Sequence, residues 1–186
     1  MTRTPAIWPL RPHCDCDEVP LDRLEAEVVR AAPLQWHFRL RGSGNTTGIR
    51  FPSPEMSSRR DGLWNHTCAE VFLMEAGGTY CEFNFSPSTQ WAAYCFESYR
   101  SGMKEQGLAS APRIECTRTP DSFVLDADVD LTGVFEMQAR SLRMGIAVVI
   151  EQTDGAISYW ALAHPPGKPD FHHADSFVGV LRDKVN

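Results

Sequence analysis

Long hydrophobic runs are missing from this sequence. No segment approaches the roughly 18 apolar residues that a membrane-spanning helix needs. The first residues, 1–18, contain no apolar stretch of signal-peptide length and soon turn acidic. We therefore expect a soluble, cytoplasmic protein that has no membrane partner.

An excess of basic charge is also missing. The 18 Lys and Arg residues are outnumbered by 24 Asp and Glu residues, which leaves a formal net charge of −6. Non-specific binding to nucleic acid or to an anionic membrane requires a basic surface. We expect neither partner.

The familiar catalytic motifs are absent as well. The chain has no Gly-x-Ser-x-Gly, no His-Glu-x-x-His, no phosphate-binding glycine loop and no dinucleotide fingerprint. A carboxylate pair for glycoside hydrolysis needs only spatial proximity, and nothing in the sequence singles one out. The sequence favours a binding protein over an enzyme.

Six cysteines are present, an even number that suits either disulfides or free thiols. They are Cys14, Cys16, Cys68, Cys81, Cys95 and Cys116. Without a secretion signal, a domain of this size does not need covalent cross-links, so we expect reduced thiols. Three of them lie in apolar runs and are expected to be small core residues.

Clear helical periodicity is scarce, whereas strand patterns dominate. Apolar and polar side chains alternate along residues 34–40 and 122–129, which is typical of half-buried strands. Further strand candidates are residues 69–74, 80–85, 91–96, 144–150 and 157–162, together with 24–28, which also suit a short helix. One short helix is expected over 134–142, with Thr132 as its cap.

From these eight candidate segments we expect roughly nine or ten short strands in all, several of them separated by turn signals such as Asp154-Gly155. We predict that residues 1–186 form one all-β domain. Its expected architecture is an antiparallel, jelly-roll-like β-sandwich with at most one or two short helices.

The segment 62–72 carries the first candidate site. Trp64 lies in a polar loop just before a strand, and Glu70 lies within that strand. An indole face packs on the C–H face of a sugar ring while a carboxylate accepts its hydroxyls. The alternative is that Trp64 is a lid on the core and Glu70 is solvated.

The next strand offers polar groups on one face. Tyr80, Glu82 and Asn84 share a face because side chains alternate along a strand. Such a face suits a ligand, but any solvated sheet face has the same pattern.

Two histidine-containing segments could hold a metal. Of His172 and His173, which Asp170 and Asp175 flank, at most one is expected to join a given site, since neighbours on a strand point to opposite faces. Histidines that hydrogen-bond the backbone are the alternative. The stretch 13–16, His-Cys-Asp-Cys, lacks a second ligand pair at structural-zinc spacing. We expect no metal at either place.

The residues Leu63-Trp64, Cys68 and Glu70–Leu73, followed by Glu-Phe-Asn-Phe at 82–85, resemble the DOMON-like β-sandwiches. These include the family 9 carbohydrate-binding modules, and residues 170–179 resemble the closing loop and last strand of those modules. The similarity covers roughly residues 34–181. Small stand-alone bacterial DOMON-like proteins share the Phe-Asn-Phe-Ser-Pro-Ser and Trp-Ala-Ala-Tyr stretches.

The resemblance implies roles for individual residues. Two aromatic rings sandwich the sugar in those modules, and they correspond here to Trp64 and Phe171. The family's Glu and Asn correspond to Glu70 and Asn84. Two departures stand out: Phe171 replaces a Trp, and Glu82 replaces a basic residue, which changes the charge of the site.

The resulting prediction is non-catalytic binding of a carbohydrate or sugar-like small molecule in a cleft at one edge of the sandwich. The cleft is expected where the Trp64 loop meets the loop 169–175. Its ligand-binding residues would be Trp64, Glu70, Glu82, Asn84, Phe171 and His172.

Other functions stay open at this point. The wider DOMON group includes haem-binding proteins, which need Met and His ligands converging on one pocket. An enzyme centred on the loop 170–175 and a protein-interaction role are further alternatives. No Asp-rich loop has the spacing of a calcium site. We expect no cofactor, with calcium or haem as the alternatives.

Overall fold

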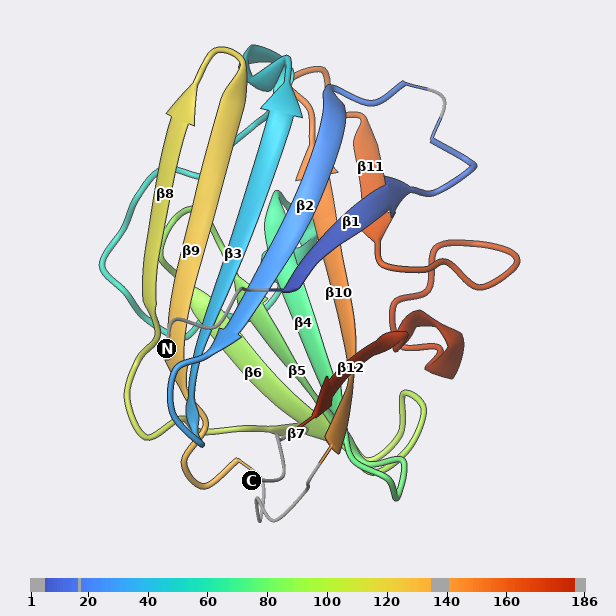
Figure 1. Cartoon of the computed structure of the whole chain (residues 1–186). Helices are drawn as coiled ribbons and strands as arrows, with labels where there is room; N and C mark the ends of the chain where they lie inside the picture. Colours follow the sequence, from blue (N-terminus) through green and yellow to red (C-terminus); the bar gives the residue numbers. More distant parts are fainter. Residues whose placement is uncertain (1–5, 17, 135–140, 183–186) are drawn as a thin grey trace.

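The computed structural model describes residues 6–16, 18–134 and 141–182, and these form an almost purely β structure (Figure 1). The strands are β1 Ala6–Pro12, β2 Leu21–Arg30, β3 Gln35–Gly44, β4 Cys68–Met74, β5 Tyr80–Phe85, β6 Trp91–Phe96, β7 Lys104–Glu105, β8 Arg113–Thr119, β9 Ser122–Asp130, β10 Ser141–Glu151, β11 Ile157–Ala161 and β12 Gly179–Arg182. The helical turns within these ranges are three 3₁₀ segments: η1 Thr46–Gly48, η2 Leu63–Asn65 and η3 Ala174–Ser176. No helix in the described part of the chain is long and apolar enough to cross a membrane.

The strands form two antiparallel layers. Sheet A has the order β1-β2-β3-β9-β8, and sheet B has the order β7-β6-β5-β4-β10-β11, with β12 also paired to β10. Strand β1 belongs to both layers, since its residues 6–10 pair with β2 and its residues 11–12 pair with β11. The predicted all-β sandwich is confirmed, with one corner at which a strand passes from one sheet to the other.

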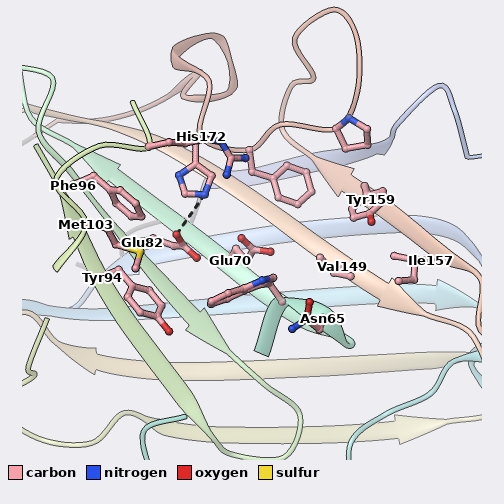
Figure 2. Close-up of a pocket in the computed structure, with 14 residues that line it drawn as sticks. Asn65, Glu70, Glu82, Tyr94, Phe96, Met103, Val149, Ile157, Tyr159 and His172 are labelled. Atoms are coloured by element: carbon pink, nitrogen blue, oxygen red, sulfur yellow. Dashed lines mark ion pairs between the residues drawn. The ribbon is translucent and has the colours of Figure 1, made fainter. Parts of the chain in front are cut away.

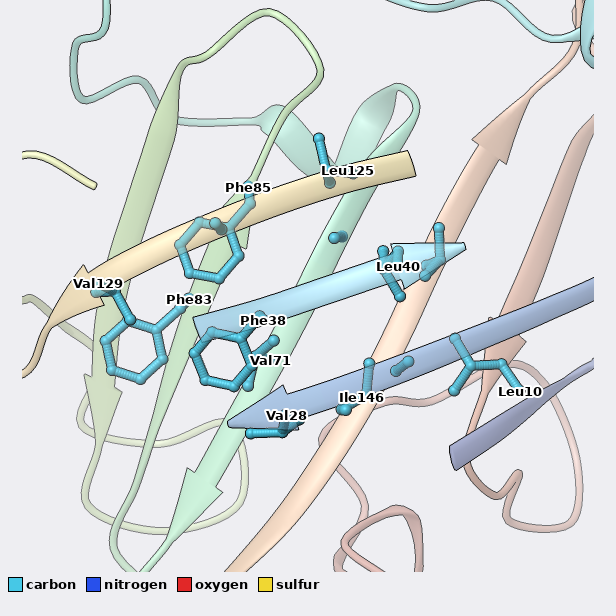
Figure 3. Packing of buried hydrophobic residues seen from close by; sticks show 14 of the residues in the cluster. Leu10, Val28, Phe38, Leu40, Val71, Phe83, Phe85, Leu125, Val129 and Ile146 are labelled. Atoms are coloured by element: carbon cyan, nitrogen blue, oxygen red, sulfur yellow. The ribbon is translucent and has the colours of Figure 1, made fainter. Parts of the chain in front are cut away.

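The space between the sheets holds the main core. Alternation along β3 directs Phe38 and Leu40 inward, and alternation along β4 does the same for Val71. In Figure 3 these side chains meet Phe83 and Ile146, which come from sheet B. Each large apolar side chain buried in this way contributes roughly 1.5–3 kcal/mol of transfer free energy.

Sheet B buries its outer face too. A second apolar cluster lies there, and it includes Phe72, Tyr80, Phe96, Phe171 and Phe177. The last two come from the segment 162–178, which folds over β10 and β4. Sheet B is therefore covered on both faces, and this explains why β4 and β5 are continuous buried runs.

Most predicted strands are confirmed, and the ambiguous segment 24–28 lies within β2. The sequence analysis missed β1, β7 and β8. Pro9 and Pro12 obscure β1, because proline donates no ladder hydrogen bond, and β8 is largely polar. Residues 135–140 of the predicted helix 134–142 lie outside the described residues, and its last two residues begin β10.

The expectation that all cysteines are reduced thiols is wrong for one pair. Cys81 on β5 and Cys95 on β6 form a disulfide. They are direct cross-strand partners in the antiparallel ladder, which brings their side chains together on the core face. The other four cysteines are free.

Candidate functional site

A cleft of about 570 Å³ lies on the outer face of sheet B (Figure 2). It is lined by Trp64, Asn65, Glu70, Glu82, Tyr94, Phe96, Arg100, Met103, Val149, Ile157, Tyr159, Pro169, Phe171 and His172. Its floor comes from strands β4, β5, β6 and β10, and the 98–103 and 169–172 loops supply part of its wall. Rings and two carboxyl groups share one concave surface.

Strand alternation places the two carboxyl groups. Glu70 on β4 and Glu82 on β5 both point away from the main core, as Tyr94 does on β6. Glu70 lies directly opposite Asn84 in the β4–β5 ladder, which confirms the predicted antiparallel pairing of these strands. Glu82 lies opposite Tyr94 in the β5–β6 ladder.

Trp64 is presented by the 3₁₀ turn η2. Gly62 precedes the turn with a φ of 75°, a left-handed conformation that glycine adopts without steric cost. Leu63 is buried and anchors the turn, whereas Trp64 remains 40% exposed. Its indole meets Tyr94 edge-on, with ring centroids 5.8 Å apart. Trp64 is therefore not a buried lid on the core.

Phe171 reaches the same cleft from a distant part of the chain. Its ring packs against Tyr159 and His164, with centroid distances of 6.1 and 6.3 Å. Only 8% of Phe171 is exposed. The structure thus brings both predicted aromatic residues to one cleft, Trp64 as an open surface and Phe171 as a mostly covered part of the wall.

Glu82 is held by a network of hydrogen bonds. The Asn84 amide donates to Glu82 Oε1 at 2.7 Å. On the other side, the Tyr80 hydroxyl accepts from the Arg100 backbone N–H and shares a hydrogen bond of 2.8 Å with His172 Nδ1. His172 Nε2 lies 3.6 Å from Glu82 Oε2 (Figure 2).

The electrostatics keep His172 neutral. Burial, and then the charge of Arg100, lower the pKa of His172 to about 4. Burial also raises the pKa of Glu82 above its usual range, although Asn84 and Arg100 oppose this shift. His172 is thus a neutral side chain beside a buried acid.

Glu70 differs from Glu82 because nothing holds its carboxyl group. The residue is 4% exposed, and among the described residues no side chain or backbone group hydrogen-bonds to it. Burial, followed by the charge of Glu82, holds the pKa of Glu70 well above its usual range, although the charge of Arg100 opposes this shift. A buried carboxyl group that faces a cleft without a partner is uncommon, because such a group normally costs stability.

Arg100 is the residue that the sequence analysis missed most clearly. It stands in an irregular loop at a φ of 51°, and its guanidinium donates to Asp170 Oδ1 at 2.9 Å. The Tyr99 hydroxyl donates to Asp170 Oδ2 at 2.6 Å. Two loops about 70 residues apart are thereby joined at the cleft, and no local pattern signals such a contact. Strand alternation along 91–96, in contrast, could have indicated Tyr94 and Phe96.

Two expectations about the site need correction. Asn84 is completely buried and does not line the cleft; its side-chain amide donates a hydrogen bond to Glu82. The cleft lies over the outer face of sheet B rather than at an edge of the sandwich, because Glu70 and Glu82 project from the middle of their strands. Of the two neighbouring histidines, His172 lines the cleft, while His173 caps η3 through the Asp175 N–H.

The metal and haem alternatives find little support in the side chains. Within the described ranges, His13, Cys14 and Asp15 are the group of three metal-ligating side chains, with ligand atoms within 4.8 Å of one another. With one carboxylate, this group does not suit calcium. The cleft brings Met103 and His172 together, but both ring nitrogens of His172 face protein groups, since Nδ1 hydrogen-bonds to Tyr80 at 2.8 Å and Nε2 lies 3.6 Å from Glu82. These residues do not fit a haem.

Comparison with known proteins places the fold. No family model and no curated protein matches the sequence. Among solved structures, a candidate carbohydrate-binding protein from Bacteroides uniformis has a TM-score of 0.65 at 12% identity, over 96% of this chain and 86% of that chain. A family 9 carbohydrate-binding module from Caldicellulosiruptor kristjanssonii, in complex with cellotriose, has a TM-score of 0.53 at 8% identity, over 86% and 74%. The chain has the β-sandwich fold of these proteins.

Proposed function

We propose that this protein binds a carbohydrate or sugar-like small molecule, without catalysis, in the cleft on the outer face of sheet B. One observation carries the proposal: the exposed indole of Trp64 stands beside the unpartnered carboxyl group of Glu70. An indole provides a flat apolar surface for the C–H face of a sugar, and a carboxyl group accepts its hydroxyls. The fold shared with a module in complex with cellotriose supports the same function.

The state of Asp170 supports binding rather than catalysis. Its two carboxylate oxygens accept hydrogen bonds from Arg100 and Tyr99, so this carboxylate joins two loops. Asp175 is exposed and does not line the cleft. The loop 170–175, which was the candidate centre of an enzyme, therefore contributes no free carboxylate to the cleft.

Substitution of Trp64 tests the proposal. Isothermal titration of D-glucose, cellobiose and D-glucosamine should show that Trp64→Ala weakens binding by about 1–3 kcal/mol, as expected for a central aromatic anchor. The melting temperature should stay close to that of the wild type, because the ring is already 40% exposed. Met56→Ala is the matched control, since Met56 is 86% exposed and lies outside the cleft lining.

Three outcomes would contradict the proposal. One is a large loss of stability in Trp64→Ala with binding unchanged. Another is the absence of both heat and melting shift with every sugar tested. Release of nitrophenol from nitrophenyl glycosides by the wild type, lost in Glu70→Gln, would overturn its non-catalytic part.

A further inference from the structure

The cleft has an imbalance of charge. Its lining contains two carboxyl groups, Glu70 and Glu82, and one guanidinium, that of Arg100. Arg100 is already matched by Asp170, at 2.9 Å. His172 stays neutral, so it adds no positive charge. Neither buried carboxyl group forms an ion pair with Arg100, whose charge acts on both of them only from a longer distance.

Glu70 shows this imbalance of charge most directly. Glu82 accepts from Asn84, whereas the equally buried Glu70 accepts from no described residue, although it faces the cleft. Removing a carboxylate from water costs several kcal/mol unless hydrogen bonds or a cation repay it. The nearby charge of Glu82 adds to the cost, as the raised pKa of Glu70 shows. A positively charged ligand would offset both the cost of removing the Glu70 carboxylate from water and its repulsion by Glu82.

The remaining wall is aromatic. Trp64, Tyr94, Phe96, Tyr159 and Phe171 all line the cleft. The faces of such rings attract an ammonium group, and the attraction grows when the cation is desolvated. Rings and carboxyl groups together suit a ligand that has an apolar ring face and a positive charge. Free carboxylates disfavour an acidic sugar, since like charges repel.

We propose that the ligand is an amino sugar or a close analogue, with its protonated amine seated between Glu70 and Glu82 and its ring on Trp64. This rests on the proposed sugar-binding function and adds the charge of the ligand. The amine of such a sugar has three N–H donors, which suits two carboxyl groups with free oxygen positions. A charge-assisted hydrogen bond of this kind is roughly twice as strong as a neutral one.

The test compares D-glucosamine, D-glucose and N-acetyl-D-glucosamine by titration calorimetry in the presence of EDTA, at equal ionic strength. Acetylation removes the charge and keeps the sugar ring. We expect the wild type to bind glucosamine at least about tenfold more tightly than either neutral sugar, a difference of about 1.4 kcal/mol. Glu70→Gln should abolish this preference, because it removes the charge that attracts the amine.

Glu115→Gln is the matched control, because Glu115 is an exposed carboxylate on β8 in the other sheet. It should leave the preference unchanged. Equal binding of all three sugars, each lost in Trp64→Ala, would overturn the amine assignment and leave the sugar site standing. Cyclohexylamine that binds as tightly as glucosamine would show that the hydroxyls contribute nothing, and would overturn the sugar site instead.

A divalent cation is the remaining occupant to exclude. Without EDTA, calcium chloride alone should not raise the melting temperature of the wild type by more than it raises that of Glu70→Gln. A calcium-dependent rise that Glu70→Gln removes would assign the carboxyl pair to a metal and overturn the proposal.

Discussion

Charged side chains are arranged differently on the outer faces of the two sheets. On sheet A, Arg39 contacts Asp126 at 2.5 Å and His37 contacts Asp128 at 2.7 Å, in both cases between residues directly opposite in the β3–β9 ladder. On sheet B, Glu70 lies opposite Asn84, whose amide donates to Glu82 instead. Sheet A pairs its charges across strands and remains solvated, whereas sheet B buries carboxyl groups among rings.

This difference supports the proposal that the outer face of sheet B is the binding surface. Cross-strand ion pairs contribute roughly 0.2–1 kcal/mol each to stability, and they leave the charged side chains of such a face with a partner inside the protein. A face with buried, unmatched carboxyl groups loses stability, and such a loss is typical of surfaces selected to bind something else. The contrast therefore supports the proposed site without reference to any ligand.

The largest effect on stability should come from truncating a side chain in the apolar layer beneath the cleft. Phe72 is fully buried on the outer face of sheet B and contacts the rings of Phe177 and His172. We expect Phe72→Ala to lower the free energy of unfolding by about 3–5 kcal/mol. Val124→Ala on the outer face of sheet A should cost only about 0.5 kcal/mol. Urea unfolding measures both, and similar losses would show that the two faces are not different.

The histidine in the cleft should titrate far below the ordinary range. The pKa of His172 is about 4, because burial and Arg100 disfavour its charged form; Tyr80, Glu82 and Asp170 are its other charged or titratable neighbours. The unfolded chain takes up this proton near pH 6.5 and the folded chain does not. Stability should therefore be complete above about pH 6.5 and fall by roughly 2–3 kcal/mol as the pH drops to about 4.

Two-dimensional NMR of the imidazole resonances checks this value directly. A His172→Gln variant, which can still hydrogen-bond to Tyr80 through its side-chain amide, should lack that part of the acid dependence in urea unfolding. A midpoint near 6.5 for His172 would show that the cleft is wetter than its burial suggests.

Glu70 should produce a pH dependence of the opposite sign. The folded state holds the Glu70 proton to higher pH than the unfolded chain does. Stability is therefore greatest below the ordinary Glu pKa of about 4.3 and falls as the pH rises above it. Glu70→Gln should gain on the order of 1 kcal/mol at neutral pH and nothing in acid. Urea unfolding across this range, with Glu115→Gln as control, measures the gain, and a loss at neutral pH would mean that Glu70 has a partner after all.

The smallest effect on stability should come from breaking an ion pair on the outer face of sheet A. Arg39 and Asp126 are half-exposed, and a pair of this kind contributes about 0.2–1 kcal/mol. A double-mutant cycle with Arg39→Ala and Asp126→Ala should return a coupling energy in that range, reduced by added salt. A coupling above about 2 kcal/mol would place this pair with buried ones and weaken the contrast between the faces.

The sequence alone predicted much of the architecture. Alternation with a period of two identified β3 and β9, and it assigned Glu82 and Asn84 to one face of β5. These features are local, because a strand directs successive side chains to opposite faces whatever its neighbours are. The β4–β5 hairpin was predictable for the same reason, since a short turn fixes its register.

The sequence could not show which of the residues on that face meet a ligand. Asn84 and Glu82 share a face, yet one is a buried support and the other lines the cleft. The cross-strand disulfide was not predicted either, because it depends on Cys81 and Cys95 falling opposite each other on neighbouring strands.

What the sequence by itself determined is therefore most of the strands and their two faces, together with the prediction that Trp64, Glu70 and Phe171 lie at one cleft. Only the tertiary structure showed that Arg100 joins the cleft, that Phe171 is a mostly covered part of its wall, and that a second apolar layer closes over sheet B. The physical reason is the distance along the chain. Strand alternation and turns depend on a few neighbouring residues, whereas the Arg100–Asp170 contact joins residues that are 70 positions apart. A contact of that kind forms only when the whole sandwich positions both loops.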